Sequence, residues 1–124
     1  MMVTILKPDF IYCDERGNLT QLVHEGYAQV NVVRSQKETE RGGHLHRDNA
    51  EVFYVVEGSF DLRAWQGTDE ETYRFSGGDM FRIERNVAHS FIYLEDTILV
   101  ALYDKGIESG GEKDIIPAEP PKIQ

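Results

Sequence analysis

The sequence contains few cysteines, few basic residues and no long apolar runs. Its one cysteine, Cys13, excludes a disulfide within the chain and favours a reducing compartment. We expect Cys13 to be a small buried apolar residue. Lysine and arginine number 13 against 22 aspartates and glutamates, a formal net charge of −9. This balance argues against nucleic acid and anionic membranes as partners.

No apolar run approaches the ~20 residues of a membrane span, and residues 1–8 lack the basic-then-apolar order of a signal peptide. We therefore expect a cytoplasmic protein. A length of 124 residues is typical of one domain, and 40% hydrophobic residues with six Tyr and six Phe indicate a globular fold. We treat 1–124 as a single domain in which residues 105–124, rich in Gly and Pro, form an irregular tail.

Short segments rich in Val, Ile, Phe and Tyr recur along the chain, separated by Gly, Asp or Asn. Most intervening segments are too short for crossover helices, so we expect mainly antiparallel sheets in a barrel or jelly roll. The predicted strands cover residues 10–13, 18–24, 28–34, 52–57, 59–65, 72–75, 80–83, 88–93 and 98–103.

Glycine marks the predicted turns. Residues 14–18 and 57–59 are predicted to close hairpins, and residues 76–79 to form a turn. Residues 66–71 are predicted to form an acidic, exposed loop. Within the tail, residues 114–117 form the segment able to pack or to add an edge strand.

Three of the four histidines gather in one pattern with a carboxylate. His44, His46 and Glu51 lie close together, and His89 follows about forty residues later. Three imidazoles and one carboxylate form a complete set of protein ligands for a divalent transition metal such as Zn, Fe, Mn, Ni or Co. Four protein ligands leave about two positions of an octahedral ion open to water, dioxygen or substrate oxygens.

Strand alternation allows these four side chains to meet. His44 and His46 are two residues apart, so they point the same way from an extended segment. Glu51 shares a face with aromatic and aliphatic residues of the next strand, and His89 shares one with Tyr93. The pattern predicts four ligands that face the interior of a barrel near one of its mouths.

The spacing of these residues resembles the first motif of the cupin superfamily: His-x-His, three or four residues, Glu, six residues and Gly. The chain has His44 and His46, four residues, Glu51, six residues and Gly58. Glu38 stands where the motif begins with Gly.

The second cupin motif is matched in spacing from Gly78 to His89. Glu84, Asn86 and Tyr93 stand where the motif has Pro, Gly and Asn. Asn86 is able to adopt the positive φ of such a turn. The resemblance implies an all-β fold, the cupin-type antiparallel double-stranded β-helix or jelly-roll barrel, and a homodimer.

Shorter segments look like small cupins of nucleotide-sugar metabolism. Residues 14–19 resemble the Asp-x-Arg-Gly turn of sugar-nucleotide 3,5-epimerases and 3,4-ketoisomerases, and residues 41–46 resemble an Arg-Gly-x-His-x-His segment of the ketoisomerases. Residues 73–97 are similar to the cupin domain of a capsular-polysaccharide nucleotide-sugar enzyme. Residues 29–34 lack the active-site tyrosine of the ketoisomerases, and the segment from His46 to Glu51 is one residue longer than theirs.

The resemblance implies a metal-dependent isomerase or epimerase that abstracts a proton beside the carbonyl of a nucleotide-linked keto sugar. In this hypothesis the catalytic acid or base is Tyr93, or a free histidine if the metal is absent. Arg41 and Arg16 hold a phosphate or orient the sugar, and Phe53 and Phe91 contact the substrate.

Three alternatives remain open. An iron-dependent dioxygenase would use the same ligands and an aromatic face for a small organic substrate. A non-enzymatic cupin would bind a small molecule without converting it. A metal that only braces the barrel mouth is the third alternative.

Overall fold

The computed structural model describes residues 2–107 and 113–122. No helix in these residues is long and apolar enough to cross a membrane. The described strands are β1 (Val3–Leu6), β2 (Phe10–Asp14), β3 (Gly17–Gln21), β4 (Gln29–Ser35), β5 (Glu40–Leu45), β6 (Glu51–Glu57), β7 (Ser59–Gln66), β8 (Asp69–Ser76), β9 (Met80–Ile83), β10 (Ala88–Tyr93), β11 (Thr97–Tyr103) and β12 (Ile116–Pro117).

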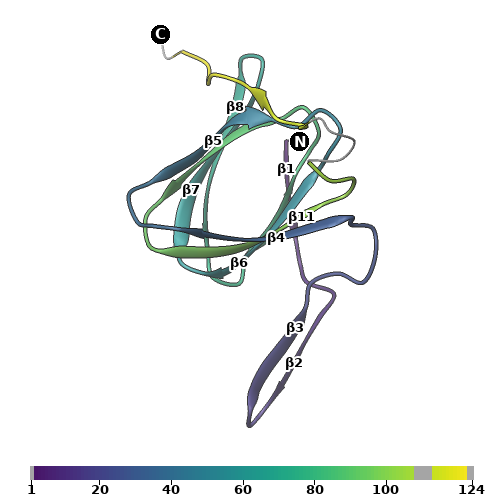
Figure 1. Ribbon diagram of the computed structural model, residues 1–124. Helices are drawn as coiled ribbons and strands as arrows, with labels where there is room; N and C mark the ends of the chain where they lie inside the picture. Colours follow the sequence, from purple (N-terminus) through teal and green to yellow (C-terminus); the bar gives the residue numbers. More distant parts are fainter. Residues whose placement is uncertain (1, 108–112, 123–124) are drawn as a thin grey trace.

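Two five-stranded sheets form a barrel (Figure 1). One sheet has the order β1-β9-β6-β11-β4 and the other β12-β5-β10-β7-β8. Every strand pair in the two sheets is antiparallel. The predicted all-β antiparallel jelly roll is confirmed. The predicted strands omitted β1 and β5.

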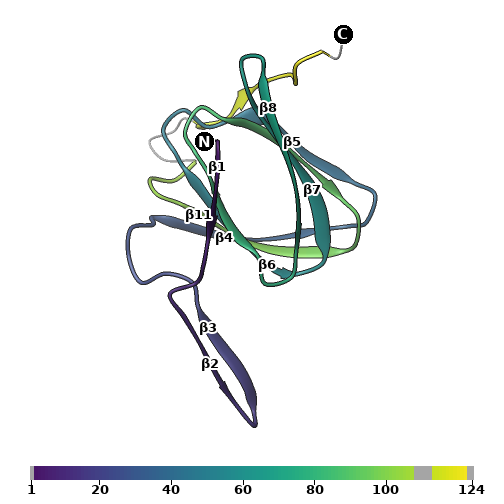
Figure 2. The same cartoon turned by 180° about the vertical axis from the view of Figure 1, so that it is seen from behind.

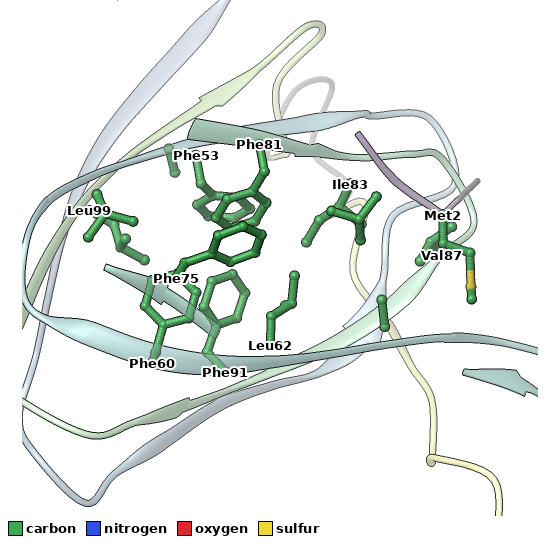
Figure 3. Close-up of a cluster of buried hydrophobic side chains, with 14 of the residues drawn as sticks. Met2, Phe53, Phe60, Leu62, Phe75, Phe81, Ile83, Val87, Phe91 and Leu99 are labelled. Atoms are coloured by element: carbon green, nitrogen blue, oxygen red, sulfur yellow. The ribbon is translucent and has the colours of Figure 1, made fainter. Parts of the chain in front are cut away.

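The barrel interior is filled by aromatic rings that point inward from both sheets (Figure 3). Phe75 and Phe81 stack with ring centroids 4.1 Å apart, and Phe53 packs on Phe81 at 5.4 Å. Phe60 and Phe91 approach each other to 5.1 Å. Burying one such side chain stabilises the folded protein by roughly 1.5–3 kcal/mol, so this cluster is a main source of stability. Because aromatic rings fill the middle of the barrel, a polar site inside it has room only near the strand ends.

The hairpin β2–β3 projects away from the barrel, as both views show (Figures 1 and 2). Its strands pair with each other and with no other described strand. Ile11, Tyr12 and Leu19 are consequently exposed. Cys13 is exposed as well, so the expectation of a buried Cys13 is wrong. An alternating apolar pattern predicts burial only where a strand packs on a second layer.

Two predicted turns differ in the structure. Gly58 does not close a hairpin, because β6 pairs with β9 and β11 whereas β7 pairs with β8 and β10. The chain passes there from one sheet to the other, with Gly58 at φ +99°. The predicted acidic loop is also shorter, because residues 69–71 belong to β8 and only Gly67 and Thr68 connect the strands. The predicted turn at residues 76–79 is present, with the Asp79 N–H donating to the Ser76 carbonyl at 3.0 Å.

Two non-glycine residues of the described part of the chain have positive φ, and both stand where the cupin motifs have glycine. Glu38 has φ 67° and Asn86 has φ 68°. Left-handed backbone is costly for most residues and less so for Asn, whose short polar side chain bonds locally. The Asn86 N–H donates to the His46 carbonyl at 2.8 Å, so this turn fixes the backbone of one of the histidines.

The C-terminal segment reaches the barrel. β12 pairs with β5, with Ile116 opposite Leu45 and Pro117 opposite His44. The edge strand expected within residues 114–117 of the tail is therefore present. Residues 108–112 and 123–124 of the predicted tail lie outside the described residues.

Candidate metal centre

β5 and β10 bring His44 opposite His89 as a register pair. The two strands approach closely at Gly42, whose φ is +108°. A β-carbon built there would lie 2.5 Å from the His89 carbonyl oxygen and 2.8 Å from the Ser90 Cα. No residue larger than glycine fits at position 42 unless one strand moves. The close approach of β5 to β10 therefore sets the distance between the imidazoles of His44 and His89.

Glu51 begins β6 and turns its carboxylate to the histidines. Its Oε1 lies 2.7 Å from Nε2 of His46 and 3.0 Å from Nε2 of His89. The side chains of all three residues are at most 5% exposed. Two ring nitrogens therefore converge on one carboxylate oxygen in a site closed to bulk water.

The opposite nitrogen of each ring is occupied by a backbone carbonyl. Nδ1 of His46 lies 2.5 Å from the Asp114 carbonyl, and Nδ1 of His89 lies 3.1 Å from the Val87 carbonyl. A carbonyl only accepts hydrogen bonds, so both Nδ1 atoms carry the proton. In a neutral imidazole Nε2 is then a bare lone pair, and here it faces the negative oxygen of Glu51.

Two lone pairs at this distance need a cation between them. Nε2 of His46 and Oε1 of Glu51 are buried and have no hydrogen-bond partner of good geometry among the described residues. Neighbouring ligands ~2.1 Å from an octahedral ion lie about 3.0 Å apart, close to the separations around Glu51. The ligand atoms of His44, His46 and His89 lie within 4.8 Å of one another. The donor set fits a divalent transition metal.

Electrostatics around Glu51 favour opposite charges. Burial opposes the charged carboxylate, but the imidazoles of His89 and His46 outweigh it and hold the pKa of Glu51 well below its ordinary value. Burial likewise opposes a charged His46, and the Glu51 carboxylate outweighs it, so the pKa of His46 is raised. Without a metal, a proton on His46 fills the place between the two atoms.

His44 and Tyr103 complete the site. Burial, with the neighbouring imidazoles of His89 and His46, lowers the pKa of His44 to about 4, so this ring is neutral at neutral pH. His44 is also the half-buried member of the cluster. Burial and the charge of Glu51 raise the pKa of Tyr103 far above its ordinary value, so its hydroxyl keeps its proton.

Tyr103 was not among the residues predicted for the site. It lies directly opposite Glu51 in the β6–β11 register, on the same face. The predicted catalytic residue, Tyr93, lies at the other end of β10 from His89, where it is buried against Phe60. Because Tyr103 joins Glu51 through sheet register, no local spacing in the sequence marked it.

The four predicted substrate contacts lie in different places. Arg41 donates from Nε to the Ser35 hydroxyl at 2.8 Å, near the Tyr93 end of β10. Arg16 is ion-paired with a neighbouring aspartate on the projecting hairpin, and the structure does not bring it to the histidines within one chain. Phe53 and Phe91 are buried in the aromatic core, and Phe91 meets the edge of His89 with ring centroids 6.0 Å apart.

Residues 31–103 match the family model of the cupin domain. The chain belongs to the cupin family. The matched residues include all four predicted ligands of this cupin, together with Tyr103. A comparison with curated proteins gave no match.

Solved structures share the fold of this cupin at low identity. A variant of a 3,4-ketoisomerase from Thermoanaerobacterium thermosaccharolyticum, in complex with TDP-4-keto-6-deoxyglucose, has a TM-score of 0.77 and 20% identity over 93% of this chain and 86% of that one. A 3,4-ketoisomerase from Helicobacter canadensis has a TM-score of 0.78 and 17% identity over 94% and 90%. A dTDP-4-dehydrorhamnose 3,5-epimerase from Elizabethkingia anophelis has a TM-score of 0.71 and 20% identity over 88% and 72%.

Proposed function

We propose that this cupin is a metal-dependent enzyme that isomerises or epimerises a nucleotide-linked keto sugar. In this proposal His44, His46, Glu51 and His89 hold the ion. The observation that carries the proposal is the pair of buried imidazole nitrogens turned onto one oxygen of Glu51, 2.7 and 3.0 Å away.

The substrate class comes from the similarity of the fold. The neighbours include enzymes that act on TDP-linked keto sugars, one of them in complex with TDP-4-keto-6-deoxyglucose. Such sugars have acidic C–H bonds beside a carbonyl, and moving those protons is the chemistry of both isomerisation and epimerisation. The buried polar cluster of this cupin is suited to that task because it combines ionised and protonated oxygen groups.

The proposed role of each residue follows from its protonation state. A bound divalent ion would polarise the sugar carbonyl as a Lewis acid. Tyr103 keeps its proton and is placed to donate it, or a hydrogen bond, to a substrate oxygen that gains charge. Glu51 is ionised beside it and would help to hold the ion. The carbonyls on Nδ1 of His46 and His89 hold both rings in place.

The direction of approach follows from burial. The aromatic core fills the space beneath the site, and His44 is the half-buried member of the cluster. A sugar would therefore reach the site from the His44 side, with its nucleotide outside the aromatic core.

Two measurements test the proposal. Elemental mass spectrometry of the protein purified without added metal should give near-stoichiometric Zn, Fe, Mn, Ni or Co, and His46→Ala and Glu51→Ala should lower it. Proton NMR in D₂O should then show metal-loaded protein exchanging the C–H protons beside the carbonyl of TDP-4-keto-6-deoxyglucose. The His24→Ala variant removes the one histidine outside the cluster and should match wild type.

Each failure has a separate meaning. Full metal content in both ligand variants would contradict the ligand set. A metal-loaded protein that leaves the keto sugar unexchanged would contradict the enzymatic proposal. Stoichiometric iron with oxygen uptake in the presence of a small organic substrate would replace the isomerase with a dioxygenase.

A further inference from the structure

The pair of Glu51 and Tyr103 lies at the end of the ladder between β6 and β11. β6 begins at Glu51 and β11 ends at Tyr103, so the register of the two strands ends with this pair. The ends of strands open more readily than their centres, because fewer contacts hold them. Side chains that must stay opposite each other at such an end need a further tie beyond it.

The side chain of Asn49 supplies a tie beyond this last pair. Its Oδ1 accepts hydrogen bonds from the backbone N–H groups of Lys105 and Gly106, both at 3.0 Å. Its Nδ2 donates to the Gly106 carbonyl at 3.1 Å. A neighbouring strand would make such bonds to the chain that follows Tyr103. Here a single amide makes them, two residues before Glu51.

The amide of Asn49 is buried and fully bonded. The residue is 1% exposed, and Nδ2 also donates to Oδ2 of Asp114 at 2.8 Å. The two lone pairs of Oδ1 and the two hydrogens of Nδ2 are therefore all used. An aspartate at this position would turn an oxygen towards the Gly106 carbonyl and the Asp114 carboxylate. The geometry therefore requires both a donor and an acceptor, which asparagine provides.

Asp104 ties the same two stretches of chain nearer the surface. Its Oδ1 accepts from the Ala50 N–H at 3.2 Å, and its Oδ2 pairs with the Arg85 guanidinium. Arg85 also donates from Nε to the Asp48 carbonyl at 3.1 Å. The Arg85 side chain is 44% exposed, and exposed ion pairs stabilise a fold only weakly. The buried amide of Asn49 is consequently the stronger tie.

We propose that Asn49 is a positioning residue that keeps Tyr103 opposite Glu51 at the end of the β6–β11 ladder. The consequence for catalysis rests on the proposed function, in which Tyr103 is the proton donor and Glu51 a metal ligand. A displacement of about 1 Å at reacting groups slows a reaction by as much as roughly 10²-fold. Loss of the tie should therefore lower the turnover rate rather than the affinity for substrate.

The test compares Asn49→Leu with Thr97→Val. Leucine has nearly the shape of asparagine but makes none of its hydrogen bonds. Thr97 lies at the opposite end of β11, is 2% exposed and donates to the Glu95 carbonyl at 2.8 Å, a bond that valine cannot make. In full-length, metal-free protein labelled with fluorotyrosine, ¹⁹F NMR reports the surroundings of Tyr103. The Tyr103 line is identified by its absence from Tyr103→Phe.

We expect the Tyr103 line of Asn49→Leu to shift or broaden, and that of Thr97→Val to match wild type. With metal-loaded protein, the kcat for proton exchange on TDP-4-keto-6-deoxyglucose should fall about tenfold or more in Asn49→Leu, with KM within about twofold. Thr97→Val should keep both values.

An unchanged Tyr103 line in folded Asn49→Leu would overturn the proposal, and so would an equal change in Thr97→Val. If Asn49→Leu does not fold, Asn49→Ser decides by the same measurements, because water is able to fill part of the space beside serine. A displaced Tyr103 line with unchanged kcat would reject the role in catalysis. A metal-loaded wild type that exchanges no proton would contradict the proposed function, while the fluorine comparison would still confirm or reject the positioning by Asn49.

Discussion

Gly42 lies against His89 so closely that a β-carbon on Gly42 would be 2.5 Å from the His89 carbonyl oxygen. The atoms in the way are backbone, which has no rotamer to change. Gly42→Ala should therefore lower the free energy of unfolding by at least ~2 kcal/mol. It should also weaken metal binding, because it separates His44 from His89. Urea unfolding and metal titration measure the two effects.

Gly67→Ala is the matched control for this substitution. Gly67 also has positive φ, at 61°, but a β-carbon there meets nothing within 4 Å. Gly67→Ala should lower the free energy of unfolding by only the ~1 kcal/mol that a non-glycine residue with positive φ costs. Metal binding should not change. Equal costs at the two glycines would show that the contact between β5 and β10 is not what demands glycine.

In the metal-free protein, the Glu51–His46 pair should contribute most to stability between pH 4.5 and 6.5, the ordinary pKa values of its two members. The lowered pKa of Glu51 stabilises the fold above 4.5, and this contribution is lost as the pH falls through the folded-state pKa. The raised pKa of His46 stabilises the fold below 6.5, and this contribution is lost as the pH rises through its folded-state pKa. Urea unfolding in the presence of a chelator measures the free energy of unfolding at each pH. The difference between wild type and Glu51→Gln gives the contribution of the Glu51–His46 pair. A difference between the two proteins that does not vary with pH would contradict the pairing.

Tyr103→Phe should slow proton exchange on the keto sugar roughly 10²-fold, because it removes the proton donor beside Glu51. Metal affinity should stay within a few fold, since Tyr103 is not proposed as a ligand. Tyr93→Phe removes a hydroxyl at the other end of β10 and serves as the control. A larger loss in Tyr93→Phe than in Tyr103→Phe would return the catalytic role to Tyr93.

The exposed hairpin β2–β3 should form the interface of a homodimer. An isolated two-stranded hairpin is marginally stable in water, and this one exposes Tyr12 and Leu19 as cross-strand neighbours. Light scattering should give about twice the 14.2 kDa of one chain. Tyr12→Asp with Leu19→Asp should give monomers, whereas Val30→Asp with Val32→Asp on β4 should not. Monomeric wild type would exclude the dimer, and the reverse pattern would move the interface to β4.

Local patterns predicted most strands, and their spacing identified the histidines and Glu51 as one cluster. Strands β9 and β10 match their predicted bounds, because glycine or polar turn residues flank dense runs of aromatic and aliphatic residues. His44 and His46 share a face for the same local reason. The positive φ of Asn86 could be predicted because Asn86 replaces a motif glycine, whereas the positive φ of Glu38 was not predicted.

Long-range partners could not be predicted in this way. Tyr103 joins the cluster through β6–β11 register, and Asp114 reaches His46 across 68 residues. No local sequence pattern around Tyr103 or Asp114 indicates these contacts. The prediction that Cys13 is buried was wrong for a related reason. Alternation along β2 indicates which residues share a face, but it does not indicate whether another layer covers that face.

The contact between His46 and Asp114 also bears on the kinetics of folding. It closes a loop of 68 residues, so the chain loses much of its entropy before this contact can form. Contacts of such separation are usually absent until the sheets around them have paired. An ion captured by the finished cluster would therefore arrive after the rate-limiting step of folding. It would slow unfolding and leave the refolding rate unchanged.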